Sequence, residues 1–431
     1  MGMRAGVWAL AAGAVVGCRA PAPTPFVVRE PVPTAVPVSA ALPWVTPAGL
    51  TIDLRALKPA PTPDPTTFRG LTDGQCAGLA AANAAAANLL DGEGKVPCAE
   101  TAAGRLRAEL RYFAALELRN KAAGEALERF FQLADVEARA GLVREALPVL
   151  EELSRRATRA KAEGVAFPFD PADLGRQRSQ VQSQLEQAEA GTRLLNLDLR
   201  HRLQLEPPAP GETLWPTGNF AIDPIPVDPA AMAEAAVATR AELRGLRALV
   251  AGLSSETLED VRAHLHAANP LLGGRGVQAA IARSVVQKIA PDATAVAQEV
   301  SVRRQQLSDW LATRERMIGD ETRAAAEALN AQTTRLALAR DRADSWKAKW
   351  DDAVQQKAAG LPRAEFTEFS VRLEWLKARG EVIAEVMAWH QARAKLSAAR
   401  GALAPDPGGG GVVVPAGSPP PVVPWVPAGV R

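Results

Sequence analysis

The second half of the chain contains the stretch LNAQTTRLALARDRADSWKAKW, residues 329–350, in which apolar side chains recur with the period of a coiled coil. Two positions in every seven are apolar, namely Leu329, Leu336, Ala343 and Trp350, with Ala339, Trp346 and Ala353 three residues after the last three of them. These are the a and d sites of a helical seam. No proline interrupts residues 302–359. At about 1.5 Å per residue, the pattern predicts a rod of roughly 80–90 Å that must lie against other rods.

The first half repeats this pattern 196 positions earlier without a gap. The shift superimposes Glu125 on Glu321, Leu133 on Leu329, Arg139 on Arg335 and Leu142 on Leu338. The corresponding seam sites are Leu133, Ala140, Leu147 and Ser154, with Val143, Leu150 and Ala157, and six of these seven are apolar. The sequence therefore predicts an equivalent long helix over residues 103–161, with Pro148 as its one internal proline.

Each long helix is predicted to turn back on itself. Gly164 and Gly360 occupy matched positions and suit the left-handed cap that ends many helices. Turns follow at 165–171 and 361–363, and returning helices are expected over 172–205 and 364–400. Short helices at 73–90 and 229–253 can stack on the ends of the returning helices. The expected fold is all-α, a duplicated pair of long antiparallel hairpins.

Proline marks the boundaries of these repeats, because it fixes φ and removes a backbone donor. The first hairpin repeat is assigned to residues 71–205 and the second to 229–403, joined by a Pro-rich crossover at 206–228. A Pro-rich tether at 18–70 precedes them, and a Gly- and Pro-rich tail at 404–431, expected to be disordered, follows.

Residues 1–17 have the pattern of a signal peptide. Arg4 precedes an apolar run that is too short to span a bilayer and closes in Val15-Val16-Gly17-Cys18. The residues before Cys18 resemble a bacterial lipobox, which implies cleavage there and acylation of that cysteine. An ordinary secretory signal is the alternative. Arg19, where an Asp would retain a lipoprotein in the inner membrane, favours the outer membrane.

The two other cysteines are Cys76 and Cys98. In an oxidising periplasm they can pair as a disulfide, and two buried free thiols are the alternative.

The order of segments resembles the TolC-like outer-membrane efflux family. The likeness rests on the leucine-rich stretch 194–203 followed by Trp215-Pro216, on 238–248, on 314–318 and on the duplication. The resemblance implies a homotrimer whose six hairpins form a periplasmic tunnel, which docks on a periplasmic adaptor and an inner-membrane pump. It also implies that the adaptor meets the tip turns, which contain Gly164, Phe167, Pro168, Gly360, Leu361 and Pro362.

One feature of that family is not expected. Its members place a pair of membrane strands ahead of each long helix, yet residues 91–98 are too few for strands of roughly 9–11 residues. Residues 270–301 offer only the short stretch 276–281. We therefore predict little or no β-barrel, with attachment at the periplasmic face of the outer membrane through the lipid on Cys18.

Composition excludes several other functions. With 50 basic and 48 acidic residues the net charge is +2, which gives no reason to expect nucleic acid as a partner. His264 and His266 point away from each other on a helix, so no metal site is expected, nor any cofactor or catalytic group. The chain is predicted not to be an enzyme. The alternatives are a scaffolding coiled-coil lipoprotein without a pore and a periplasmic adaptor, although adaptors combine one hairpin with β-rich domains.

Overall fold

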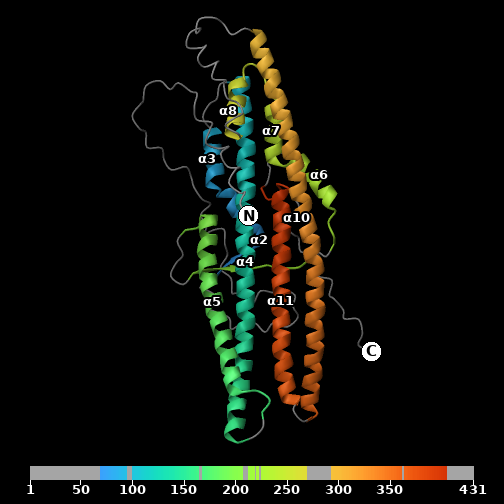
Figure 1. Cartoon of the computed structure of the whole chain (residues 1–431). Helices are drawn as coiled ribbons and strands as arrows, with labels where there is room; N and C mark the ends of the chain where they lie inside the picture. Colours follow the sequence, from blue (N-terminus) through green and yellow to red (C-terminus); the bar gives the residue numbers. More distant parts are fainter. Residues whose placement is uncertain are drawn as a thin grey trace.

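The computed structural model describes residues 68–94, 100–164, 167–206, 212–218, 220–222, 225–268, 293–361 and 364–404. Four long helices dominate it (Figure 1): α4 (Ala102–Ala162), α5 (Pro171–Leu203), α10 (Ala293–Ala358) and α11 (Ala364–Ala399). They form two antiparallel hairpins whose turns lie at the same end of the molecule. The expected duplicated all-α fold is confirmed.

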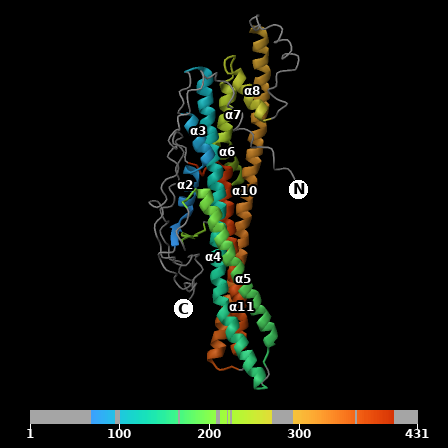
Figure 2. The same cartoon turned by 90° about the vertical axis from the view of Figure 1, so that its left-hand side faces the viewer.

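Shorter helices cover the other end and the middle of the rods (Figure 2): α2 (Asp73–Ala82), α3 (Ala85–Gly94), α6 (Pro229–Thr239), α7 (Ala241–Ala251) and α8 (Leu258–Ala268). The helix predicted over 73–90 breaks at Asn83, and the one predicted over 229–253 breaks at Arg240, whose backbone is extended. Helix α8 was not predicted.

Local sequence explains where the helices begin and end. Thr72 and Gln75 form a capping box ahead of α2, and Thr101 caps α4. Asp170 caps α5, which starts with proline. At the far ends of the long helices, Gly164 and Gly360 have φ of 67° and 71°, a region that favours glycine.

The four long helices lie side by side in the order α5, α4, α11, α10. Most of the predicted seam is buried, including Leu133, Ala140, Leu329 and Leu336. Trp346 and Trp350 are half-buried. In α11, apolar residues recur every seven positions, and all four of them are buried: Trp375, Val382, Trp389 and Leu396. Pro148 lies inside α4, and the helix continues through it although proline has no N–H to donate.

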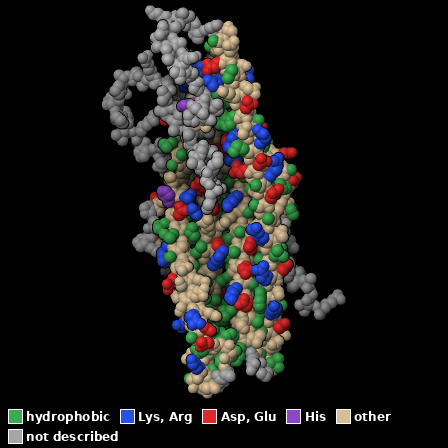
Figure 3. Space-filling view, viewed as in Figure 1, with side chains coloured by type: hydrophobic (Ala, Val, Ile, Leu, Met, Phe, Trp, Pro, Cys, Tyr) green, Lys and Arg blue, Asp and Glu red, His purple; other side chains and the backbone are tan. Residues whose placement is uncertain are grey.

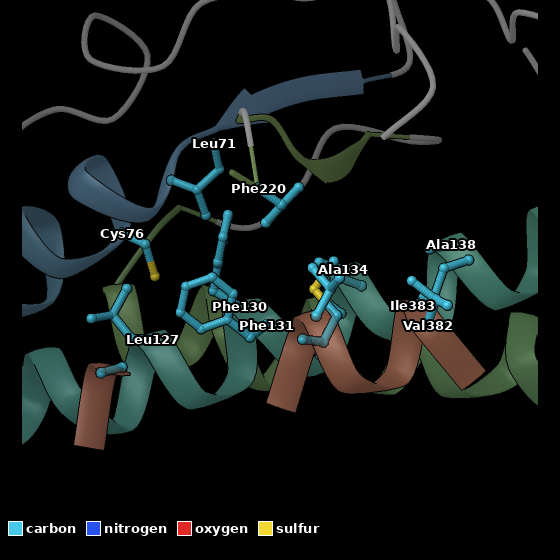
Figure 4. Close-up of a cluster of buried hydrophobic side chains, with 14 of the residues drawn as sticks. Leu71, Cys76, Leu127, Phe130, Phe131, Ala134, Ala138, Phe220, Val382 and Ile383 are labelled. Atoms are coloured by element: carbon cyan, nitrogen blue, oxygen red, sulfur yellow. The ribbon is translucent and has the colours of Figure 1, made fainter. Parts of the chain in front are cut away.

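The main core lies where the crossover meets the rods (Figure 4). It joins Phe130 and Phe131 of α4 to Val382 and Ile383 of α11, with Phe220 of the crossover beside them. The buried thiol of Cys76 belongs to this cluster, and burial raises its pKa. Large apolar groups removed from water here supply most of the cohesion between the two hairpins.

Two short strands, which the sequence did not predict, lie in the described parts of the tether and the crossover. Strands β1 (Phe68–Leu71) and β2 (Thr213–Pro216) pair in parallel, with Phe68 opposite Thr213 and Leu71 opposite Pro216. Leu71 of β1 and Leu214 of β2 are buried. It attaches the start of the first repeat to the crossover that leaves it.

Several predictions fall on residues outside the described ranges. These are the signal sequence with Cys18, the tether up to 67, Cys98, Pro362 and the tail from 405. Residues 95–98 and 269–292, which bear on the expected lack of membrane strands, also lie outside them. Within the described ranges, no helix is both long and apolar enough to cross a membrane.

Candidate functional site at the hairpin tips

The tip of the first hairpin packs on the second hairpin. The ring of Phe167, in the first turn, lies 4.5 Å from the ring of Phe366 in α11, at an interplanar angle of 79°. Phe169 stands 6.1 Å from Phe167 and joins the same apolar cluster, which includes Leu174 and Phe369. The two tips are therefore one structural unit rather than two independent loops.

Charged side chains strengthen this union. Arg156 of α4 forms an ion pair with Glu365 at the start of α11, and its guanidinium lies 5.3 Å from the centre of the Phe369 ring. Lys357, near the end of α10, pairs with Glu368 at 2.8 Å. The first pair joins the two hairpins, and the second closes the turn of the second hairpin.

The predicted tip residues divide into an exposed set and a packing set. Gly164, Pro168 and Gly360 are exposed, and Leu361 keeps 52% of its surface accessible. Phe167 is half-buried because it contacts Phe366. The structure thus brings the two turns together at one end of the molecule, with an apolar side chain accessible on the second. Arg156 and Glu365 were missed, because only the register between hairpins brings them together.

Further from the tips, an aromatic and cationic cluster joins α10, α11 and α4. Trp350 and Trp375 stack with ring centroids 4.7 Å apart, and Arg379 lies 4.5 Å from the Trp375 ring. Arg379 also reaches Glu145 of α4 at 3.0 Å. Burial lowers the pKa of Arg379, although Glu145 acts in the opposite direction. This ion pair is largely dry, so it fixes the register of the hairpins more than an exposed pair would.

The crossover is attached to all four rods. We call its described residues, 212–218, 220–222 and 225–228, the strap. Asn196 of α5 donates to the carbonyl of Leu214 at 3.2 Å and accepts from the Leu214 N–H at 2.7 Å. Asn330 of α10 makes the same two bonds with Val227, at 2.9 and 3.0 Å.

Between these clamps, Phe220 of the strap lies against α4 and α11. Its ring centre stands 6.4 Å from that of Phe131 and 5.7 Å from that of His390, which stacks on Phe131 at 5.2 Å. Burial lowers the pKa of His390 to about 4, with smaller opposing effects from the Phe220 backbone and Asp73 and a further lowering by Arg393. The imidazole is therefore neutral at neutral pH. The strap fixes the distance between the two hairpins at mid-height.

The described residues thus form tandem helical hairpins in one layer, joined at their tips and held at mid-height by the strap. No protein-family model matches the chain, and no curated protein does. Solved structures do match. The Campylobacter jejuni CmeC outer membrane channel aligns at a TM-score of 0.50 and 12% identity, over 70% of this chain and 66% of that one.

A membrane protein from Pseudomonas aeruginosa aligns at a TM-score of 0.51 and 13% identity, over 69% of this chain and 70% of that one. The chain thus spans just under two thirds of the CmeC channel. At this level of identity the likeness concerns the fold. The predicted resemblance to the TolC-like outer-membrane channels is confirmed at that level: the chain shares their helical hairpin fold.

Proposed function

We propose that the chain is a non-enzymatic component of a periplasm-spanning export system, in which three copies form an α-helical tunnel like that of the outer-membrane efflux channels. The observation that supports this most strongly is the pair of duplicated hairpins, with both tips at one end and the fold of an outer membrane channel. Fold alone does not define activity. The accessible flanks of the two outer rods give a second reason to expect assembly.

Each of the two outer rods packs on one long helix, α5 on α4 and α10 on α11, and leaves much of its opposite flank accessible. In α5, buried side chains are confined to Leu174 and to residues from Asn196 onward, so the stretch 175–195 has none. On the same helix Leu194 is 68% exposed, and on α10 Leu338 is 59% exposed. Both lie on helices that mix exposed charges of either sign (Figure 3). Helices with a second unburied flank are expected in a wall that continues into further copies.

The tips suit contact with other proteins. Their residues Gly164, Pro168, Gly360 and Leu361 form the accessible end of a unit stiffened by Arg156, Glu365 and the phenylalanine contacts. We propose that this end faces the periplasm and meets the adaptor and, through it, the inner-membrane pump. The other end would lie at the outer membrane, attached through a lipid on Cys18. Pairing of Cys76 with Cys98 stays a prediction.

Cross-linking in intact cells tests the assembly. A cross-linked trimer that includes an adaptor or an inner-membrane transporter is expected. A monomer without such partners would contradict the proposal and favour the scaffolding lipoprotein.

The lipid anchor is tested separately. The Cys18→Ser variant should leave the membrane fraction and collect in the soluble periplasm. Retention of that variant in the outer membrane would show that attachment does not depend on the lipid.

A further inference from the structure

A cavity of about 340 Å³ lies between α4 and α11, toward the hairpin tips. Six side chains line it: Glu145, Pro148, Val149, Glu152, Phe369 and Arg372. Within each helix these residues are three, four or seven positions apart, so they share one face of that helix. Half of the six are apolar, and the volume falls in the range of small-molecule sites, about 300–1,000 Å³.

We propose that this cavity binds a small organic anion, with the charged group of the ligand at Arg372 and its apolar body against Val149 and Phe369. The cavity lies within one chain. The inference therefore goes beyond the proposed function and does not require copies of the chain to assemble.

The two carboxylates of the cavity already have cationic partners. Glu145 accepts a hydrogen bond from Arg379 at 3.0 Å. Glu152 forms ion pairs with Arg155 and Arg156, which follow it by three and four residues on the same helix. Neither carboxylate therefore leaves an uncompensated negative charge in the cavity.

Arg372 is the cation of the cavity that lacks such a partner. Among the described residues it forms no ion pair, and its Nε is buried without a hydrogen-bond partner. Its guanidinium lies 5.7 Å from the centre of the Trp350 ring, which stacks on Trp375. The ring attracts the charge but cannot satisfy all the N–H groups of the guanidinium. A carboxylate, sulfonate or phosphate of a ligand would supply the missing acceptor through a charge-assisted hydrogen bond.

A second arginine adds positive charge beside the cavity. The side chain of Arg379 is 3% exposed, and its Nη2 also has no hydrogen-bond partner within the described residues. Burial lowers the pKa of Arg379, Glu145 opposes that effect, and the charge of Arg372 lowers the pKa further. The two guanidinium groups are thus close enough to repel each other. An anion beside Arg372 would relieve that repulsion, whereas a cation would increase it.

The apolar side chains determine the rest of the ligand. Val149 and Phe369 are 4% and 7% exposed, and Pro148 is exposed. An inorganic anion would leave these surfaces uncovered. A molecule with rings or an alkyl body would remove them from water. The cavity therefore fits amphiphilic organic anions better than inorganic ones.

A second cavity, of about 370 Å³ between α4 and α5, provides an internal comparison. Six polar or charged side chains line it: Glu151, Arg178, Ser179, Gln182, Ser183 and Glu186. None of them is apolar, and the two carboxylates outnumber the one arginine. Arg178 is therefore a matched arginine at a cavity of similar size that should not bind an organic anion.

Fluorescence titration with anilinonaphthalene sulfonate tests the site, because this probe joins a sulfonate to apolar rings and emits strongly in apolar surroundings. The unaltered full-length protein should bind it saturably. Arg372→Gln should weaken binding about tenfold or more, as expected for the loss of a hydrogen bond to a charged group. The matched control, Arg178→Gln, should bind the probe as the unaltered protein does. Phenylnaphthylamine, which has the same rings without the sulfonate, should bind Arg372→Gln and the unaltered protein equally.

Pro148→Glu keeps the test decisive if Arg372→Gln fails to fold. Pro148 is exposed within α4, and glutamate restores the N–H that proline lacks, so this change should not disturb the helix. Its carboxylate should repel the sulfonate and weaken binding of the anionic probe more than binding of the neutral one.

Three results would overturn the anion site. These are the absence of saturable binding by the unaltered protein, equal binding of the anionic probe by the unaltered protein and Pro148→Glu, and a loss in Arg178→Gln as large as that in Arg372→Gln. Each would leave the proposed function intact, because cross-linking of the assembly is measured separately.

Discussion

Replacing Asn196 with leucine removes one clamp of the strap without shortening the side chain. Asn196 is 7% exposed, and its amide satisfies both the N–H and the carbonyl of Leu214, which is itself 1% exposed. In Asn196→Leu these two backbone groups lose their partners in a buried site. Each unsatisfied group destabilises by about 1–3 kcal/mol, and part of that loss is recovered where water enters. We expect the free energy of unfolding to fall by about 2–4 kcal/mol.

Urea unfolding followed by tryptophan fluorescence measures this change, because Trp215 lies in the same strand as Leu214. The transition midpoint should fall while its steepness stays constant. Asn88→Leu is the control, since Asn88 makes a comparable bond to the carbonyl of Ala82 at 2.9 Å, but in an exposed setting. It should change stability by less than about 1 kcal/mol. Equal effects of the two substitutions would refute the assignment of the strap as a buried clamp.

Three further predictions concern other parts of the fold. Burial lowers the pKa of His390 to about 4 from an ordinary 6.5, so the unfolded chain binds a proton at this residue before the folded chain does. The contribution of His390 to the free energy of unfolding is therefore complete above pH 6.5 and falls by about 3 kcal/mol toward pH 4. In urea titrations at several pH values, the stability of His390→Leu should change less over that range, and an unchanged pH dependence would contradict the buried neutral imidazole. Gly360→Ala should destabilise the protein by about 1 kcal/mol, because the φ of Gly360 is 71°. Gly141→Ala, at a helical position with open space around it, should stabilise the protein by about 0.5–1 kcal/mol. Thermal midpoints that move in the same direction would contradict the left-handed cap at Gly360. Phe130→Ala, at a fully buried site, should lower the free energy of unfolding by about 3–5 kcal/mol, and a loss below about 1 kcal/mol would place the core elsewhere.

The rods could be predicted because their information is local and periodic. Leu329 and Leu336 recur with the period of a helix seam, and Gly164 and Gly360 have a conformational reason to end the helices. Because the two halves share this pattern at a shift of 196 residues, the long helix expected in one half supported the long helix expected in the other. Helix bounds agreed closely for α4 and α11, and less well for α10, which starts at Ala293 rather than near residue 302.

The strap could not be predicted, because its bonds join residues that no local pattern relates. Asn330 follows Leu329 in α10 and has the sequence pattern of a solvated position, yet its amide forms two hydrogen bonds with the backbone of Val227 in the strap. The extended backbone at Arg240 has a similar origin. Arg240 leaves the helix and bonds to the carbonyl of Ala399 and to Glu117, so tertiary contacts override its helix propensity.

At the tips, sequence located the turns but not the contacts between them. Gly164 and Phe167 were expected at the end of the first hairpin, and they lie there. The contact of Phe167 with Phe366, and that of Arg156 with Glu365, depends on how far one hairpin slides along the other. That register is set by side chains in the buried layer between α4 and α11, including Arg379 and Glu145.

Electron cryomicroscopy of the full-length protein, extracted from membranes in mild detergent, examines the assembled state most directly. Viewed down the long axis, three chains should form one closed ring of six hairpins, with α5 of each chain beside α10 of the next. Isolated rods of a single chain, or rings in which α5 and α10 of neighbouring chains stand apart, would contradict the account.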